Sequence, residues 1–122
     1  MISAVLWQRI EGALILLGAL VLYGQYADLM PWWAALLIFF VPDLGMLAYG
    51  AGARAGAFVY NIVHIYAFGL AFMALGYVLG WPVLAGVGAL WLAHSGFDRA
   101  LGYGLKLPEG FSFTHLGRIG KP

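Results

Sequence analysis

Apolar residues run along the chain in four long and almost uninterrupted stretches. They cover residues 4–27, 31–50, 56–79 and 82–103. Each stretch is close to the roughly 20 residues that an α-helix needs to cross about 30 Å of hydrocarbon. Because the stretches are continuously apolar rather than alternating, they indicate helices and not the strands of a membrane barrel. The pattern predicts an all-α fold, a bundle of four transmembrane helices within residues 1–103.

The breaks between the stretches are short and carry residues that interrupt helices. Pro31 and Pro82 each open a stretch, where the missing N–H of proline costs no helical hydrogen bond. Gly52 and Arg54 lie in the break between the second and third stretches. Connections this short predict that consecutive helices are antiparallel neighbours.

Residues 104–122 differ in character from the four stretches. A turn around Pro108 is followed by aromatic and aliphatic residues set among polar ones. This pattern predicts a short cytoplasmic tail at the membrane interface. The tail is interpreted either as an amphipathic surface segment or as a lid over the mouth of the bundle.

The composition is typical of a membrane protein and limits the kinds of metal site and binding partner that the chain can have. Of the 122 residues, 64% are hydrophobic and 9% are charged, whereas soluble domains are about half apolar and about a quarter charged. The formal net charge of +1 provides no basic surface for nucleic acid. Because the chain has no cysteine, disulfides, thiolate zinc sites and iron–sulfur clusters are excluded. Any metal ion must therefore have nitrogen and oxygen ligands.

The basic residues predict the orientation of the bundle. All of them lie at one predicted side, near the start of the first stretch, between the second and third, or at and after the end of the fourth: Arg9, Arg54, Arg99, Lys106, Arg118 and Lys121. The two remaining connections carry only Asp28 as a charged residue. By the positive-inside rule, both termini are expected in the cytoplasm.

Small residues mark places where helices can approach closely. Ala85, Ala89 and Ala93 recur at four-residue spacing in the fourth stretch. Such a stripe is interpreted first as packing within the monomer and alternatively as the contact face of a homo-oligomer.

Five ionisable residues lie inside the predicted spans, where such groups are costly and are functional candidates by default. Counted from the cytoplasmic helix ends at 1.5 Å per residue, four of them are expected roughly 12–14 Å into the bundle. These four are Glu11, Asp43, His64 and His94. The fifth, Asp98, is expected nearer the surface, at roughly 7–8 Å. All four helices are therefore predicted to contribute to one polar site.

The spacing of polar residues places them on common helix faces. Asn61 and His64 are three residues apart, and His94 and Asp98 are four apart, which are the intervals that bring side chains together on a helix. Tyr60 is four residues from His64 and is expected to line the same cavity. Carboxylate and imidazole groups on facing helices are the usual components of metal sites in helical bundles.

The leading hypothesis is a metal-dependent membrane enzyme that hydrolyses a lipid-like substrate. Asp43, His64 and His94 are the predicted ligands of Zn²⁺ or Fe²⁺, because imidazole and carboxylate suit these ions. Asp98 is a further ligand or a catalytic group, and Glu11 is the predicted general base. The residues assigned to the surrounding shell or to substrate binding are Tyr60, Asn61, Arg99 and His115.

Other interpretations of the same residues remain open. Asp98 could pair with Arg54 or Arg99, and Glu11 with Arg9, near the membrane surface. The two span histidines could be axial haem ligands, although nearby carboxylates argue against haem. The polar residues could also form a proton relay or a purely structural polar core, and His115 could be an ordinary surface histidine.

The polar motifs resemble a known family. The strings that carry the resemblance are FVPDLGML (residues 40–47), GAFVYNIVH (56–64), AHSGFDRALGYGLK (93–106) and THLG (114–117). They are similar to a small bacterial integral membrane family catalogued as domain of unknown function 4260, and the similarity extends over nearly the whole chain, Glu11 included. The resemblance implies a helical protein of the bacterial inner membrane, with lipids as its surroundings. It implies no activity.

The predicted orientation can be tested with topology reporters. Because all six basic residues lie on one predicted side, a reporter fused after Pro122 is expected to be cytoplasmic, and one inserted at Asp28 is expected to be external. Paired phosphatase and fluorescent-protein fusions measure this directly. An external C-terminus would overturn both the orientation and the depth argument.

Overall fold

The computed structural model describes residues 3–120, and most of them are helical, as the all-α prediction requires. Helix α1 (Ala4–Tyr23) continues as the 3₁₀ helix η1 (Gly24–Leu29), and α2 (Trp32–Phe40) continues as the 3₁₀ helix η2 (Val41–Ala51). Each of these two continuous helices is long and apolar enough to cross a membrane. They coincide closely with the first two predicted spans.

The third predicted span, residues 56–79, is interrupted in the structure. Helix α3 (Ala53–His64) and helix α4 (Tyr66–Val78) meet at a bend of 47°, and together they form a third candidate span only if the bent pair is counted as one. Ile65 at the bend has extended backbone angles, φ −76° and ψ 149°. The α-helical hydrogen-bond pattern cannot continue through such a residue.

Two side chains from the neighbouring helix bind the carbonyl groups at the end of α3. Trp91 donates a hydrogen bond from Nε1 to the carbonyl of Val63 at 2.7 Å, and Arg99 donates from Nη2 to the carbonyl of His64 at 2.7 Å. Backbone carbonyls without partners are expensive in an apolar environment. The break is therefore stabilised by tertiary contacts.

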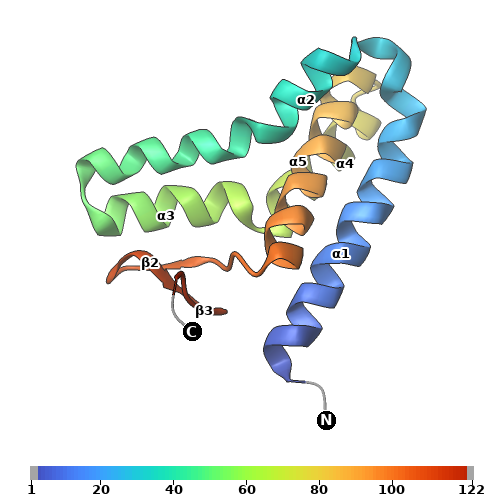
Figure 1. The fold of residues 1–122 in the computed structure, drawn as a ribbon. Coiled ribbons are helices and arrows are strands. Elements are labelled where there is room, and N and C mark those ends of the chain that lie inside the picture. The colour runs from blue at the N-terminus through green and yellow to red at the C-terminus, as the bar shows by residue number, and fades with distance from the viewer. Residues whose placement is uncertain (1–2, 121–122) are drawn as a thin grey trace.

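Helix α5 (Pro82–Leu101) lies at the centre of the fold, with α1 and α4 packed against it (Figure 1). Residues along nearly its whole length are buried. In the part of the chain that the structure describes, α5 is not among the helices apolar enough to count as a span. A helix shielded by protein on several sides needs less apolar surface than one facing lipid. The count of four spans thus stays a prediction.

Paired glycines allow the helices around α5 to approach closely. A Cβ built on Gly12 of α1 would lie 2.8 Å from the carbonyl oxygen of Gly96, and one on Gly69 of α4 would lie 2.9 Å from that of Gly88. Both distances are too short for real Cβ contacts. Such contacts between small residues are a common means of packing helices in membranes. The stripe of Ala85, Ala89 and Ala93 is also buried within the monomer.

Helices η2 and α3 form a hairpin that runs away from α1, as Figure 1 shows. The hairpin turns at Gly52, whose φ of 114° is unfavourable for residues with a side chain. This turn sets η2 and α3 antiparallel and places Asp43 near the end of α3.

Part of the expected tail is a small antiparallel sheet of order β1-β2-β3. Its strands are β1 (Lys106–Leu107), β2 (Gly110–Thr114) and β3 (Gly117–Arg118). Strands β1 and β2 contact α3. The sheet begins shortly after α5 ends at Gly102, which has the left-handed φ of 94° typical of a helix terminus. If the tail is a lid, this sheet is the folded part that would cover the mouth of the bundle.

The glycine contact between α4 and α5 can be tested by substitution. Gly69→Ala is expected to destabilise the protein by about 1–3 kcal/mol, because the added methyl group overpacks a close helix contact. Thermal unfolding in detergent, followed by circular dichroism, measures the loss. Gly18→Ala in α1 is the control, since nothing lies within 4 Å of a Cβ built at Gly18. Equal stability of the two variants would contradict the packing argument.

Candidate metal centre

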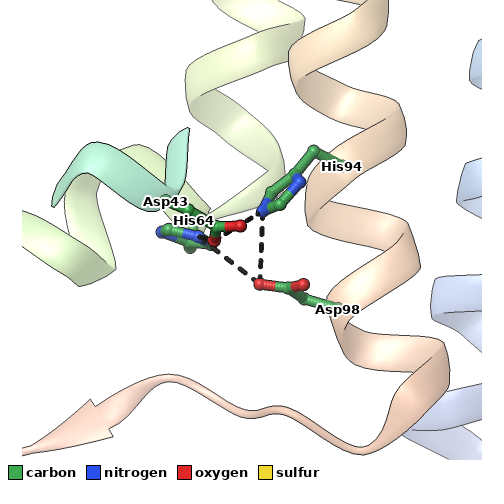
Figure 2. Close-up of side chains that lie close together, drawn as sticks. All are labelled: Asp43, His64, His94 and Asp98. Carbon is green, nitrogen blue, oxygen red and sulfur yellow. Dashed lines mark hydrogen bonds and ion pairs between the residues drawn. The ribbon is translucent and has the colours of Figure 1, made fainter. Parts of the chain in front are cut away.

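Four ionisable side chains converge near the bend between α3 and α4, as Figure 2 shows. Asp43 comes from the first turn of η2, His64 is the last residue of α3, and His94 and Asp98 lie one turn apart on α5. These four residues are called the Asp–His cluster below. Three helical elements supply it, and the sequence-predicted ligands Asp43, His64 and His94 are all members.

The distances within the Asp–His cluster are short and similar. Asp43 Oδ1 lies 3.3 Å from His64 Nε2 and 3.1 Å from His94 Nε2. Asp98 Oδ2 lies 3.4 Å from each of the same two nitrogen atoms. All four ligand atoms lie within 4.8 Å of one another.

The four N···O distances match the spacing of neighbouring donor atoms around one metal ion, whereas the limit of 4.8 Å for all pairs is wider than that spacing. Bonds of about 2.0–2.2 Å to nitrogen and oxygen give a tetrahedron with edges of about 3.3–3.6 Å. The four N···O distances, from 3.1 to 3.4 Å, agree with those edges to within a few tenths of an ångström. The residues of the Asp–His cluster could therefore hold a metal ion.

The hydrogen bonding of His64 supports a cation at the centre of the Asp–His cluster. Its Nδ1 lies 2.8 Å from the carbonyl oxygen of Tyr60, which can only accept, so Nδ1 carries the proton. In the neutral ring, Nε2 then presents a lone pair toward two carboxylate oxygens. Three acceptors facing one another repel, and either an added proton or a metal ion removes the repulsion. Donation from Nδ1 to a carbonyl is also the usual orientation of a metal-bound histidine.

The Asp–His cluster is buried on one side and open on the other. Both histidine side chains are fully buried, whereas the side chain of Asp43 is 33% exposed. The open side faces a cavity of about 300 Å³. This cavity lies between η2, α3, α5 and the sheet region, and its lining residues are Asp43, Met46, Tyr60, Asp98, Tyr103, Lys106, Phe111 and Ile119. A bound ion would therefore be accessible from the cavity.

Tyr60 lies against the Asp–His cluster, as the four-residue spacing predicted. Its ring stacks on His64 with 3.7 Å between ring centroids and an interplanar angle of 10°. The hydroxyl group donates a hydrogen bond to Asp98 Oδ2 at 3.2 Å. Tyr60 thus orients one predicted ligand and restrains another.

Asn61 binds the backbone of the sheet rather than the Asp–His cluster. Its Nδ2 donates to the carbonyl of Lys106 at 2.9 Å, and its Oδ1 accepts from the amide of Lys106 at 2.6 Å. This two-way contact attaches β1 to α3 and brings the Lys106 side chain to the cavity. In the sequence, Lys106 contributes only a charge to the predicted orientation, because its position at the cavity follows from the tertiary path of the chain.

The remaining predicted residues lie outside the Asp–His cluster. Arg99 is buried and donates to the carbonyls of His64 and Tyr103 instead of pairing with Asp98. His115 is exposed, and its Nδ1 accepts a hydrogen bond from the amide of Leu105. Partial desolvation of the imidazole ring and the charge of Arg99 lower the pKa of His115, which favours its neutral form at neutral pH.

Glu11 is exposed on α1 and is not part of the Asp–His cluster. Its predicted depth is that of the other polar residues, but depth does not determine the face of the helix from which a side chain projects. Gly12 is the residue of α1 that faces α5 at this point.

Comparison with known proteins identifies one family. Residues 5–119 match the family model described as Domain of unknown function (DUF4260). No curated protein and no solved structure matches the chain.

The attachment of the sheet by Asn61 can be tested by hydrogen exchange. Asn61→Ala is expected to speed exchange of the Lys106 amide and of the strand pairing next to it, because the amide loses its acceptor. Mass spectrometry of the peptide covering residues 104–114 measures this change. Ser112→Ala on β2 is the control, because the Ser112 side chain makes no hydrogen bond in the described part of the chain. Unchanged exchange in Asn61→Ala would mean that other contacts hold the sheet.

Proposed function

This chain belongs to the family described as Domain of unknown function (DUF4260), and we propose that it is a membrane-embedded, metal-dependent enzyme. The family description assigns no activity, so the proposal rests on the Asp–His cluster. The observation that carries it is the convergence of two buried imidazoles and two carboxylates beside an open cavity. Ionisable groups that converge in a concave site are a common feature of catalytic centres.

The proposed ligands are Asp43, His64, His94 and Asp98, and the proposed ion is Zn²⁺ or Fe²⁺. Two nitrogen and two oxygen donors suit both ions. Zinc accepts a fifth ligand during catalysis, and the exposed side of Asp43 faces the cavity from which a fifth ligand would come. These four residues would hold the ion, and the cavity would give water and substrate access to it.

Hydrolysis of a lipid-like substrate is the proposed reaction. A metal ion in this position supplies a Lewis acid and makes bound water more acidic. One water molecule adds across the scissile bond, so that its oxygen joins the acyl or phosphoryl centre and the leaving oxygen or nitrogen receives a proton. Asp98 is the carboxylate that would hold the ion and that also accepts a hydrogen bond from the Tyr60 hydroxyl. A lipid-like substrate is favoured because the cavity wall includes Met46 of a candidate span.

The haem alternative is disfavoured by the geometry of the histidines. Nε2 of His64 and Nε2 of His94 both lie next to the same oxygen of Asp43. Two axial ligands must stand on opposite faces of a porphyrin, and a shared carboxylate oxygen leaves no room for the ring.

The proposed location is the bacterial inner membrane, with both termini in the cytoplasm. The start of α1 and the sheet lie toward the same end of the molecule in Figure 1. This arrangement supports an orientation in which Arg9 and Arg118 face the same compartment, as the positive-inside rule requires.

Metal analysis of ligand variants tests the proposal. The purified protein is expected to contain about one equivalent of metal. Removing a residue that only hydrogen-bonds to a ligand typically lowers metal affinity about 10–100-fold. A larger loss is expected when a ligand itself is removed, in each of the variants His64→Ala, His94→Ala and Asp43→Asn. Elemental analysis measures the content, and circular dichroism checks that the helices persist. Binding is also expected to weaken as the pH is lowered, because protons compete with the metal ion for the imidazole nitrogens.

His115→Ala is the matched control, since this exposed histidine lies outside the Asp–His cluster. It is expected to retain the metal. A structural polar core would give the opposite pattern, with no stoichiometric metal in the parent protein and loss of stability in each ligand variant, because a buried partner is left unpaired.

A further inference from the structure

A buried lysine stands on the cavity wall opposite the Asp–His cluster. Lys106 is 4% exposed, and its Nζ lies 3.7 Å from the centroid of the Phe111 ring and 4.9 Å from that of the Tyr60 ring. Within residues 3–120 no carboxylate oxygen lies within 4.0 Å of this ammonium group. Lysine is among the residues least often buried without a charged partner.

The position of Lys106 is held by the backbone. Asn61 binds both the amide and the carbonyl of Lys106, so the side chain starts from a restrained point at the end of α3. The two aromatic rings attract the ammonium group through cation–π contacts, which only partly replace lost hydration. Burial lowers the pKa of Lys106, against the opposing effect of Asp98 and Asp43. An anion in the cavity would offset this cost.

The charges around the cavity balance only while the Asp–His cluster holds no metal. Asp43 and Asp98 carry two negative charges. Lys106 on the cavity wall carries one positive charge, and Arg99, which is buried behind the wall against the carbonyls of His64 and Tyr103, carries another. Neutral histidines add nothing to this sum. A divalent ion would leave two uncompensated positive charges in a largely buried site, which is unfavourable at low dielectric. A doubly negative ligand restores the balance.

From this placement we infer that the cavity binds the phosphate monoester of a lipid-like molecule, with its phosphoryl oxygens between the metal ion and the Lys106 ammonium group. This inference rests on the proposed function and specifies its substrate class. A phosphate monoester carries a charge of about −1.5 to −2 near neutral pH, which would balance the two positive charges that a divalent ion adds.

The rest of the cavity suits the apolar part of such a molecule. Met46 lies on η2 within a candidate span, whereas Phe111 and Ile119 belong to the sheet and the segment that follows it. The cavity therefore joins a membrane-facing element to the folded C-terminal segment. An amphiphile can place its phosphate at the charged end of this cavity and its chain along Met46.

Coupling between metal and phosphate tests the inference. Zinc affinity of the full-length protein in a non-ionic detergent is measured by competition with a chromophoric chelator. The additions are inorganic phosphate, a short-chain phosphatidic acid, or a short-chain phosphatidylcholine. Phosphatidic acid is expected to raise zinc affinity about tenfold or more, within the usual range of coupling between two ligands. Phosphatidylcholine, a zwitterionic diester, is expected to leave it unchanged, and inorganic phosphate is expected to act more weakly than phosphatidic acid.

Lys106→Met keeps an apolar side chain of similar length and removes the charge. It is expected to bind zinc without additions and to lose the enhancement by phosphatidic acid, while Lys106→Arg retains part of it. Arg118→Met is the control, because it removes one positive charge from the same sheet at an exposed residue outside the cavity. Full enhancement is expected to persist in that variant.

The outcomes separate the two proposals. No zinc binding by the parent protein defeats the proposed function. Zinc binding that phosphatidic acid does not strengthen, or strengthens equally in Lys106→Met, defeats only the phosphate inference. Equal enhancement by inorganic phosphate and phosphatidic acid overturns the lipid-like part of the ligand.

Discussion

The interruption between α3 and α4 is the constraint on which the rest of the structure depends. A helix that breaks in apolar surroundings releases carbonyl groups that must be bound by something other than water. Here Trp91 and Arg99 of α5 bind the carbonyls of Val63 and His64. Because both donors come from α5, the break can exist only where α3 meets that helix. His64, the last residue of α3, therefore lies beside the helix that carries His94 and Asp98.

This arrangement also explains why α5 is not apolar enough to count as a candidate span. It supplies two members of the Asp–His cluster and both donors that stabilise the break, so several of its side chains must be polar. Surrounding helices and close glycine contacts shield these groups from the membrane. The small residues of α5 let those helices approach. The polar side chains of α5 therefore require close packing around that helix, because buried polar groups need partners at fixed positions.

Much of the site could be predicted because it depends on local spacing. The intervals between Tyr60 and His64 and between His94 and Asp98 are helical, so pairs could be assigned to common faces before any contact was known. The bend at Ile65 could not be predicted, since no glycine or proline marks it and its stabilising donors lie far away in sequence. Glu11 was assigned by depth alone, which leaves the face of a helix undetermined. Lys106 reaches the cavity only through the pairing of its backbone with Asn61, a tertiary contact without a sequence motif.

The order of the Asp–His cluster along the chain has a consequence for biosynthesis. Asp43 is made early and Asp98 late, and the side chains that complete the cavity wall, Phe111 and Ile119, are made last. A nascent chain halted after α4 would hold Asp43 and His64 without their partners on α5, and with carbonyls still unbound at the break. The region around His64 can therefore reach its final form only when α5 has left the ribosome and packed beside α1 and α4. Assembly of the Asp–His cluster thus depends on the association of α5 with the helices made before it, and not on the formation of any single helix.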